Sequence, residues 1–191
     1  MSALRQIHNL ALIGFMGTGK SSVGRLVATA LRFEFVDTDH LLEQRAGKSI
    51  TEIFLTQGEA EFREMERRLV TEMNAWRGRV IATGGGLGAD AANLENLRQH
   101  ALVVCLWASA ENLWQRLRHQ SHRPLLQDPD PAGKIRELLM QRAPVYKQAD
   151  VLVNTELRSV REVADHVLHQ FHEASSRPPP SGFSAVPPEV S

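Results

Sequence analysis

Short apolar runs alternate with longer stretches of helical spacing along most of the chain. The apolar runs predict buried strands at residues 10–13, 33–36, 80–83, 102–107 and 151–154. Between them, apolar positions three and four residues apart predict helices at residues 20–31, 59–76, 91–99 and 159–173, and two more that start near residues 109 and 134. Strands that alternate with helices form βαβ units, so the pattern predicts a three-layer α/β/α fold, with helices on both faces of a five-stranded parallel sheet.

Local signals mark where several of these helices begin and end. Ser49 and Glu52 have the spacing of a capping box at the start of a short helix, and Gly58 separates that helix from the longer, charged helix after it. Ser159 and Glu162 have the same spacing at the start of the last helix, which is expected to fade near Glu173.

Two proline-rich segments are expected to stay outside the packed core. Residues 121–133 hold three of the nine prolines and predict an exposed, mobile loop that serves as a lid. Residues 174–191 carry five prolines and five serines, so they bury too little apolar surface to offset the entropy cost of ordering, and we expect a disordered tail. The remaining residues, 1–173, are predicted to form a single domain.

Composition and charge exclude several classes of protein. The chain has 191 residues, 42% hydrophobic and 23% charged, which is typical of one soluble domain, and no apolar run approaches the ~20 residues of a membrane-spanning helix. Its 22 acidic and 22 basic residues cancel, which argues against binding to nucleic acid or to an anionic membrane. The single cysteine, Cys105, lies in an apolar run and leaves no disulfide framework, so we expect a cytoplasmic protein. We also expect a monomer, because no assembly element is evident.

A phosphate-binding loop lies between the first predicted strand and the first predicted helix. Residues 14–21 read GFMGTGKS and match G-x-x-x-x-G-K-[ST] in full. Backbone N–H groups of such a loop converge on phosphates at the positive end of the helix, while Lys20 reaches the β and γ oxygens and Ser21 ligates Mg²⁺. The dinucleotide pattern G-x-G-x-x-G fails, because Ser22 stands at its third glycine position. The sequence therefore predicts a phosphotransferase that binds a nucleotide, not NAD.

Polar residues at the ends of two other predicted strands are candidates for binding the acceptor. Asp37 and Asp39 follow the second strand, and in an extended segment two such residues share a face, so both carboxylates could point into one cleft. One would assist Mg²⁺ and the other would accept a hydroxyl proton; a turn-and-cap pair is the equally weighted alternative. Residues 84–86 are glycines after the third strand, and they either admit a ligand close to the backbone or form a flexible turn.

These segments, taken together and in this order, resemble the shikimate kinase family. The segments are GFMGTGKS, the DTD of residues 37–39, the EFR of residues 61–63, the three glycines, the RPLL of residues 123–126 and the RAPVY of residues 142–146. The resemblance spans about residues 8–172. It implies a nucleoside-monophosphate-kinase-like fold and ATP- and Mg²⁺-dependent phosphorylation of the 3-hydroxyl of shikimate, a step toward the aromatic amino acids.

The resemblance also assigns roles to individual residues. Asp39 would bind and activate the acceptor hydroxyl, Asp37 would support Mg²⁺ through water, and Arg123 would close with the lid over the transferring phosphoryl group. Glu66 would steady Arg63. The predicted sets are Lys20, Asp39 and Arg123 for catalysis; Gly17, Thr18, Gly19, Lys20, Ser21, Ser22, Arg116 and Arg123 for ATP; Asp39, Arg63, Gly84, Gly85, Gly86 and Arg142 for shikimate; and Ser21 and Asp37 for the metal.

Two alternatives stay open at this point. One is another small-molecule P-loop kinase, similar to gluconate or nucleoside monophosphate kinases, although the DTD, GGG and arginine segments argue against it. The other is a catalytically silent module that binds a ligand and regulates a partner. Such a module would be free to lose Lys20, Asp39 or Arg123, and all three are present.

Overall fold

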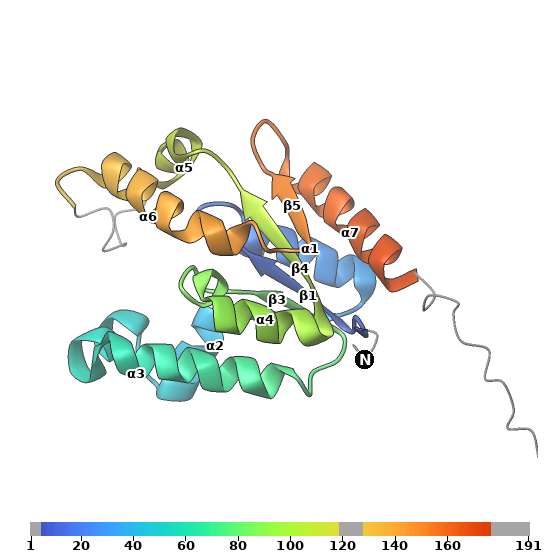
Figure 1. Ribbon diagram of the computed structural model, residues 1–191, viewed down its shortest axis with the longest axis horizontal. Helices are drawn as coiled ribbons and strands as arrows, with labels where there is room; N and C mark the ends of the chain where they lie inside the picture. The colour runs from blue at the N-terminus through green and yellow to red at the C-terminus, as the bar shows by residue number, and fades with distance from the viewer. Residues whose placement is uncertain (1–4, 119–127, 177–191) are drawn as a thin grey trace, which may run out of the picture.

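The computed structural model describes residues 5–118 and 128–176, which form a three-layer α/β/α domain (Figure 1). Its five strands are β1 (Asn9–Ile13), β2 (Glu34–Asp37), β3 (Arg79–Ala82), β4 (Ala101–Trp107) and β5 (Val151–Asn154). They form one sheet in the order β2-β3-β1-β4-β5, and every neighbouring pair is parallel. The predicted five-stranded parallel sheet is therefore confirmed.

The helices and one short 3₁₀ turn connect these strands. They are α1 (Lys20–Leu31), α2 (Thr38–Ala46), α3 (Ile50–Met73), η1 (Leu87–Ala89), α4 (Ala91–His100), α5 (Ala110–Leu117), α6 (Pro131–Tyr146) and α7 (Val160–Ser176). The predicted capping box is present, since Ser49 accepts from Glu52 N–H and the Glu52 carboxylate accepts from Ser49 N–H. The predicted break is also present, because Gly58 has non-helical angles (φ 86°, ψ 164°) inside α3.

Alternate residues of the strands point into two separate apolar cores. On one face, Ala11, Ile13 and Ile81 pack with side chains of α2, α3 and α4, such as Leu69 and Leu97. On the other face, alternate positions of the same strands pack against α1 and α7 (Figure 1). Because both faces are covered, the interior positions of the strands are apolar on both faces, which is why they read as short continuous apolar runs and not as alternating patterns.

The structure corrects several predicted boundaries, including the third strand, which spans Arg79–Ala82, and the long charged helix, which ends at Met73. Residues 38–46 form helix α2, where the sequence predicted none, and the second strand is shifted by one residue. Residues 131–133, predicted as part of the lid, are the first turn of α6, with Pro131 at a position where proline suits a helix and Asp130 accepting from Gly133 N–H. Residues 174–176, predicted as tail, continue α7, and Ala174 packs against the core. Of the other predicted lid and tail residues, 128–130 are described and directly precede α6, whereas 121–127 and 177–191 lie outside the described residues.

A buried polar network joins the amino-terminal ends of β1, β3 and β4. Asn9 is fully buried; its side-chain oxygen accepts from Arg79 N–H at 3.0 Å, and its Nδ2 donates to the Trp76 carbonyl at 2.8 Å and to His100 Nδ1 at 3.0 Å. The first two bonds fix the orientation of the amide, so His100 Nδ1 must be an acceptor and the imidazole must be neutral. Burial, helped by the positive charges of Arg77 and Arg5, lowers the pKa of His100 to about 4.

This network predicts a loss of stability in mild acid. The unfolded chain takes up a proton on His100 near its ordinary pKa of about 6.5, whereas the folded chain does so only near 4. The contribution of neutral His100 to the free energy of unfolding is therefore complete above pH 6.5. It is lost as the pH falls toward 4, at about 1.4 kcal/mol per pH unit and about 3 kcal/mol in all. Urea unfolding at pH 7, 6 and 5 measures this slope.

The matched variant for that experiment is His100→Asn, whose amide oxygen on Cγ can still accept from Asn9 in place of Nδ1 but does not titrate. Every other ionisable group is shared by the two proteins, so the difference between their slopes isolates His100. Parallel slopes for the two proteins would show that His100 does not set the acid stability.

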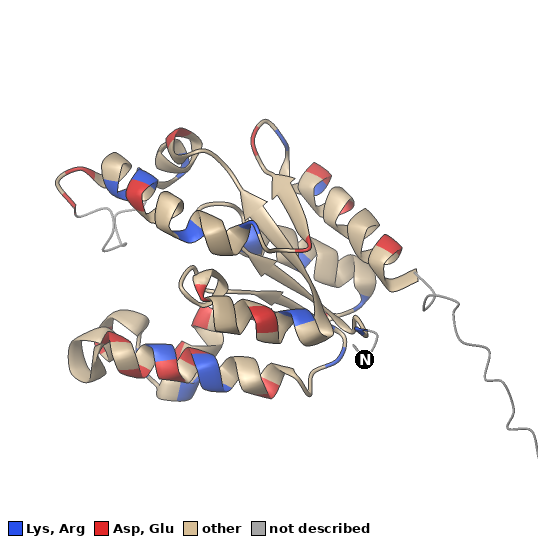
Figure 2. Ribbon diagram, in the orientation of Figure 1, with Lys and Arg blue, Asp and Glu red and all other residues tan. Residues whose placement is uncertain are grey.

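Acidic and basic residues lie close to one another along the helices, as on α3 (Figure 2). On α3, Glu64 pairs with Arg67 at 2.9 Å and with Arg68 at 3.1 Å, one helical turn away. Such exposed pairs contribute only tenths of a kcal/mol each, but they explain how a long, highly charged segment can be helical. No helix in residues 5–118 and 128–176 is both long enough and apolar enough to cross a membrane.

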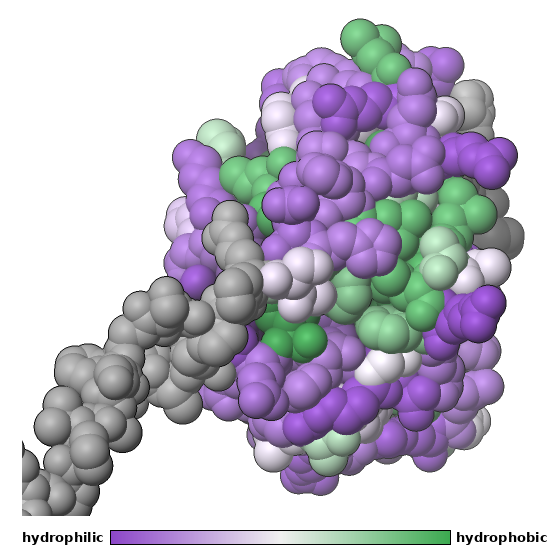
Figure 3. Space-filling model, turned by 90° about the vertical axis from the view of Figure 1, so that its right-hand side faces the viewer, coloured by the Kyte–Doolittle hydropathy of each residue, from purple (hydrophilic) through white to green (hydrophobic). Residues whose placement is uncertain are grey.

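Apolar side chains are exposed on the face formed by α1 and α7 (Figure 3). A groove of about 430 Å³ lies between these helices, and its apolar lining includes Leu26, Ala30, Ala164 and Leu168. All of the residues that line it belong to the two helices. The groove is thus a feature of the outer helical layer and does not reach the loops that follow the strands.

Candidate active site

The phosphate-binding loop lies at the carboxyl end of the central strand β1. Gly14, Gly17 and Gly19 have φ values of 131°, 82° and 93°, a region that other residues rarely adopt. Gly19 is the N-cap of α1, which begins at Lys20 as predicted. The loop therefore directs backbone N–H groups toward the positive end of a helix, the arrangement that binds phosphate.

The side chains of the loop are held by its own backbone. Lys20 Nζ donates to the carbonyls of Gly14 and Phe15, each at 2.9 Å. Thr18, which is 2% exposed, donates its hydroxyl to the Phe15 carbonyl at 2.8 Å. The ammonium of Lys20 is thereby kept over the loop, where phosphate oxygens would be bound.

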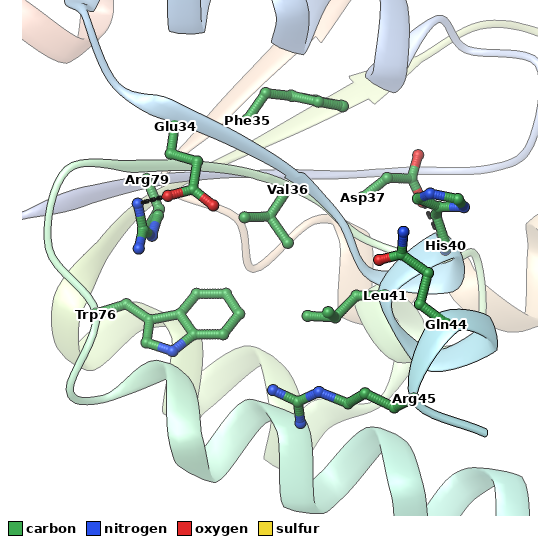
Figure 4. A pocket seen from close by; sticks show the side chains of 10 residues that line it. All are labelled: Glu34, Phe35, Val36, Asp37, His40, Leu41, Gln44, Arg45, Trp76 and Arg79. Atoms are coloured by element: carbon green, nitrogen blue, oxygen red, sulfur yellow. Dashed lines mark hydrogen bonds and ion pairs between the residues drawn. The ribbon is translucent and has the colours of Figure 1, made fainter. Parts of the chain in front are cut away.

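Asp37 connects this loop to the start of α2. Its Oδ2 accepts from Ser21 Oγ at 2.8 Å, and its Oδ1 accepts from His40 N–H at 3.4 Å as the N-cap of α2. Figure 4 shows the second contact at one end of a hollow of about 290 Å³ that runs along the outer edge of β2. The helix-cap interpretation of Asp37 is confirmed, while its role at Mg²⁺ stays a prediction; the same carboxylate meets the hydroxyl of Ser21, the other residue predicted for the metal.

Asp39 reaches the glycine loop from the first turn of α2, not from an extended segment. The predicted alternation of Asp37 and Asp39 along a strand is wrong, because the strand ends at Asp37 and the helix begins at Thr38. The Asp39 carboxylate nevertheless lies against Gly84, so closely that a Cβ added there would overlap a carboxylate oxygen. The helical turn, rather than the pleat, places this carboxylate beside the loop after β3.

The next two glycines are each met by one of the predicted arginines. Arg142, on α6, donates from Nη1 to the Gly85 carbonyl at 3.2 Å, and its guanidinium lies 5.4 Å from the centre of the Phe15 ring. Arg63, on α3, lies against Gly86, where a Cβ would overlap its guanidinium. None of these three glycines has a positive φ, so close approach of side chains, not backbone conformation, is the reason for glycine here.

Arg63 is held in place by two carboxylates. It donates to Glu66 at 2.7 Å and to Glu59 at 2.7 Å, and Glu66 itself is 1% exposed. Burial alone would lower the pKa of Arg63, but the hydrogen bonds that it donates to these carboxylates, together with their negative charge, outweigh burial and raise the pKa. Burial raises the pKa of Glu66, Arg63 counteracts that shift, and the nearby negative charge of Asp39 adds to it. Arg63 and Asp39 therefore share one electrostatic environment around Glu66.

Arg116 bridges the phosphate-binding loop and the end of β5. It donates to the Gly17 carbonyl at 3.3 Å, to Thr155 Oγ1 at 3.0 Å and to the Thr155 carbonyl at 2.7 Å. The structure thus places it at the nucleotide side of the site. Its predicted contact with adenine stays a prediction, and Arg123 lies outside the described residues.

Three residues at this site were not singled out from the sequence. Thr38 accepts from Gly84 N–H at 2.8 Å, Tyr146 donates its hydroxyl to the Gly85 carbonyl at 3.4 Å, and Phe15 lies under Arg142. Burial raises the pKa of Tyr146 to about 12, so it stays a hydrogen-bond donor at neutral pH. The sequence positions of two of them could have indicated a place at the site. Thr38 stands between two candidate aspartates, and Tyr146 follows Arg142 by one helical turn.

The contact between Gly84 and Asp39 makes Gly84→Ala a specific test of the site. The new methyl group would overlap the end of a side chain, not the backbone, so Asp39 must move while the fold is kept. A displacement of about 1 Å at a reacting group costs on the order of 10² in rate, which is the expected loss in kcat/KM. Steady-state kinetics together with thermal unfolding measures both effects.

Gly85→Ala is the matched comparison, because its Cβ would lie 3.3 Å from Arg142 Nη1, a tight contact without overlap. We expect a clearly smaller loss of activity than in Gly84→Ala. Equal losses in the two variants would contradict a specific role for the space beside Asp39.

Known proteins show the same sequence and structural features. A family model described as shikimate kinase matches residues 16–172. The shikimate kinase of Thermodesulfovibrio yellowstonii is 41% identical over 170 residues, which is 89% of this chain and 98% of that protein. A solved structure of shikimate kinase from Acinetobacter baumannii in complex with shikimate matches with a TM-score of 0.83 and 36% identity, covering 91% of this chain and 97% of the other. A gluconokinase from Sinorhizobium meliloti, 20% identical with a TM-score of 0.56 and coverages of 90% and 95%, shares the fold alone.

Proposed function

The chain belongs to the shikimate kinase family and is a kinase that phosphorylates shikimate from ATP, and we propose that the side chains described above carry out this reaction. The proposal rests on one observation: each of the three consecutive glycines after β3 lies against a different residue predicted to bind shikimate. Gly84 lies against Asp39, Gly85 against Arg142 and Gly86 against Arg63. A carboxylate and two guanidinium groups thus converge beside the phosphate-binding loop. This combination suits an acceptor that carries both a carboxylate and a hydroxyl.

The donor side of the reaction rests on the loop after β1. Its backbone N–H groups would bind the phosphates of ATP, and Lys20 would exchange its bonds to the Gly14 and Phe15 carbonyls for bonds to phosphate oxygens. The hydroxyl of Ser21 and the carboxylate of Asp37, joined at 2.8 Å, are oxygen ligands of the kind that Mg²⁺ takes, Asp37 through water. When bound, Mg²⁺ neutralises charge on the transferring phosphoryl group.

The acceptor side rests on the arginines and Asp39. Arg63 and Arg142 would bind the shikimate carboxylate, a task for which the planar, permanently charged guanidinium is suited. Asp39 would accept a hydrogen bond from the 3-hydroxyl and take its proton as the bond from that oxygen to the γ-phosphorus forms. The bond between the γ-phosphorus and the bridging oxygen of ADP breaks in the same step, and ADP carries away the electron pair.

Several further features belong to the proposal. Arg123 would stabilise charge on the phosphoryl group, a role that rests on the family resemblance. Cys105 is buried and its pKa is raised to about 12 by burial, so it is an inert thiol, in keeping with a reducing, cytoplasmic setting. We also propose that the protein uses only small-molecule substrates, since its zero net charge argues against polyanionic partners. A monomer is part of the proposal, because the sequence has no evident assembly element.

One assay tests the function against the alternatives. ADP release by the purified protein is measured with ATP and Mg²⁺ in the presence of shikimate, gluconate or nucleoside monophosphates, in parallel. We expect ADP release only when shikimate is the acceptor, and we expect EDTA to abolish it. Turnover with gluconate or a nucleoside monophosphate, or no turnover with any of them, would overturn the proposal.

A further inference from the structure

Thr38 is a polar side chain at a completely buried position beside the candidate active site. It is the first residue of α2, it is 0% exposed, and its hydroxyl oxygen accepts from the backbone N–H of Gly84 at 2.8 Å. Gly84 is buried as well. A residue that served packing alone would be apolar here, because a buried hydroxyl needs a hydrogen-bond partner to offset its desolvation.

The position of Thr38 in the chain gives this hydrogen bond a consequence. Its two neighbours are Asp37, which meets Ser21 of the phosphate-binding loop, and Asp39, which lies against Gly84. The Thr38–Gly84 hydrogen bond therefore holds the start of α2 against the glycine loop. Asp37 and Asp39, whose carboxylates contact Ser21 and Gly84, are the residues on either side of this bond. The distance between Asp39 and the loop is set by this bond and by the helical turn that contains it.

We propose that Thr38 is a positioning residue for the acceptor: its buried hydroxyl fixes the spacing between the Asp39 carboxylate and the glycine loop that receives shikimate. This inference rests on the proposed function and adds a residue to it. Thr38 does not touch the reacting atoms; it acts through Asp39 and Gly84. The backbone loop and Lys20, which would bind the phosphates of ATP, belong to the segment from β1 to α1, so we expect Thr38 to affect KM for shikimate more than KM for ATP.

Thr83, another buried threonine, directly precedes the glycine loop and provides a comparison for the hydrogen bond of Thr38. Thr83 is 3% exposed and donates its hydroxyl to the Leu12 carbonyl at 3.2 Å, but that carbonyl also accepts from Thr83 N–H at 3.0 Å. Removing the Thr83 hydroxyl leaves the carbonyl with a donor. Removing the Thr38 hydroxyl deprives the Gly84 N–H of the oxygen to which it donates, which is the costly case.

The test compares Thr38→Val, Thr38→Ser and Thr83→Val in steady-state kinetics with shikimate and ATP each varied. Thr38→Val is expected to lower kcat/KM for shikimate by about tenfold or more while KM for ATP stays within about twofold. Thr38→Ser keeps the hydroxyl and is expected to recover most of the loss. Thr83→Val, with the same change in shape and similar burial, is expected to match the wild type for both substrates.

The outcomes separate this inference from the proposed function. Shikimate-dependent turnover by the wild type is the premise, and its absence would overturn the function itself. With that turnover present, the positioning role is overturned by a Thr38→Val protein that matches Thr83→Val, by an equal rise in KM for ATP, or by a Thr38→Ser protein as impaired as the valine variant. Should Thr38→Val not fold, Thr38→Ala takes its place under the same criteria, because the smaller side chain cannot clash.

Discussion

Asp39→Asn is expected to lower kcat for shikimate phosphorylation by about 10²–10⁴, the usual contribution of a general base. Asparagine has nearly the same shape and still accepts a hydrogen bond from a hydroxyl, but it cannot take the proton. KM for shikimate should therefore change much less than kcat. The fold should be kept, because residue 39 is half-buried in the first turn of α2 and asparagine has nearly the same shape as aspartate.

The matched control for this variant is Asp90→Asn. Asp90 is also a carboxylate at the start of a helix, where its side chain accepts from Asn93 N–H as the N-cap of α4, and asparagine caps a helix equally well. We expect wild-type kinetics from it. An Asp39→Asn protein with kcat within about fivefold of the wild type would show that Asp39 is not the base.

Lys20→Met is expected to lower kcat by about 10²–10³, the typical cost of removing one group that stabilises charge in a transition state. Methionine keeps the length and the apolar stem of lysine but cannot donate to phosphate oxygens. The protein should also lose some stability, since the Nζ bonds to the Gly14 and Phe15 carbonyls disappear. Initial rates at saturating ATP and shikimate, with urea unfolding at pH 7, measure the two effects separately.

Lys48→Met provides the comparison for loss of a lysine charge, because Lys48 is exposed between α2 and α3. Its activity and stability are expected to equal those of the wild type. If Lys20→Met kept wild-type turnover, the phosphate-binding role of the loop lysine would be refuted even though the motif matches in full.

Features encoded within a few consecutive residues were predictable from the sequence. The phosphate-binding loop is one, since a strand, three glycines with positive φ and a helix start lie within residues 9–20. Strand β5 and helix α1 have the predicted bounds, and the Ser49 capping box is present. In each case the residues that decide the conformation are neighbours in the chain, so local propensity and hydrogen bonding are sufficient.

Each element that the sequence missed or misplaced has a physical explanation. Helix α2 was missed because only Thr38 and Leu42 of its nine residues are buried, which leaves almost no periodic apolar signal. The start of α6 was placed too late because proline signals both a loop and the first turn of a helix. The end of α7 was placed too early because its last turn is stabilised by packing against the core, which no local composition reveals.

The amino-acid sequence by itself predicted a loop suited to binding phosphate and the residue types that could bind an acceptor. Only the tertiary structure decided that Asp39, Arg142 and Arg63 come from three different helices to three successive glycines, and that Thr38 and Tyr146 hold the same loop. Those contacts join segments far apart in the chain, and they exist because the order β2-β3-β1 brings the ends of these strands to one edge of the sheet. Strand order depends on how both faces of the sheet are buried as a whole, so no local pattern encodes it.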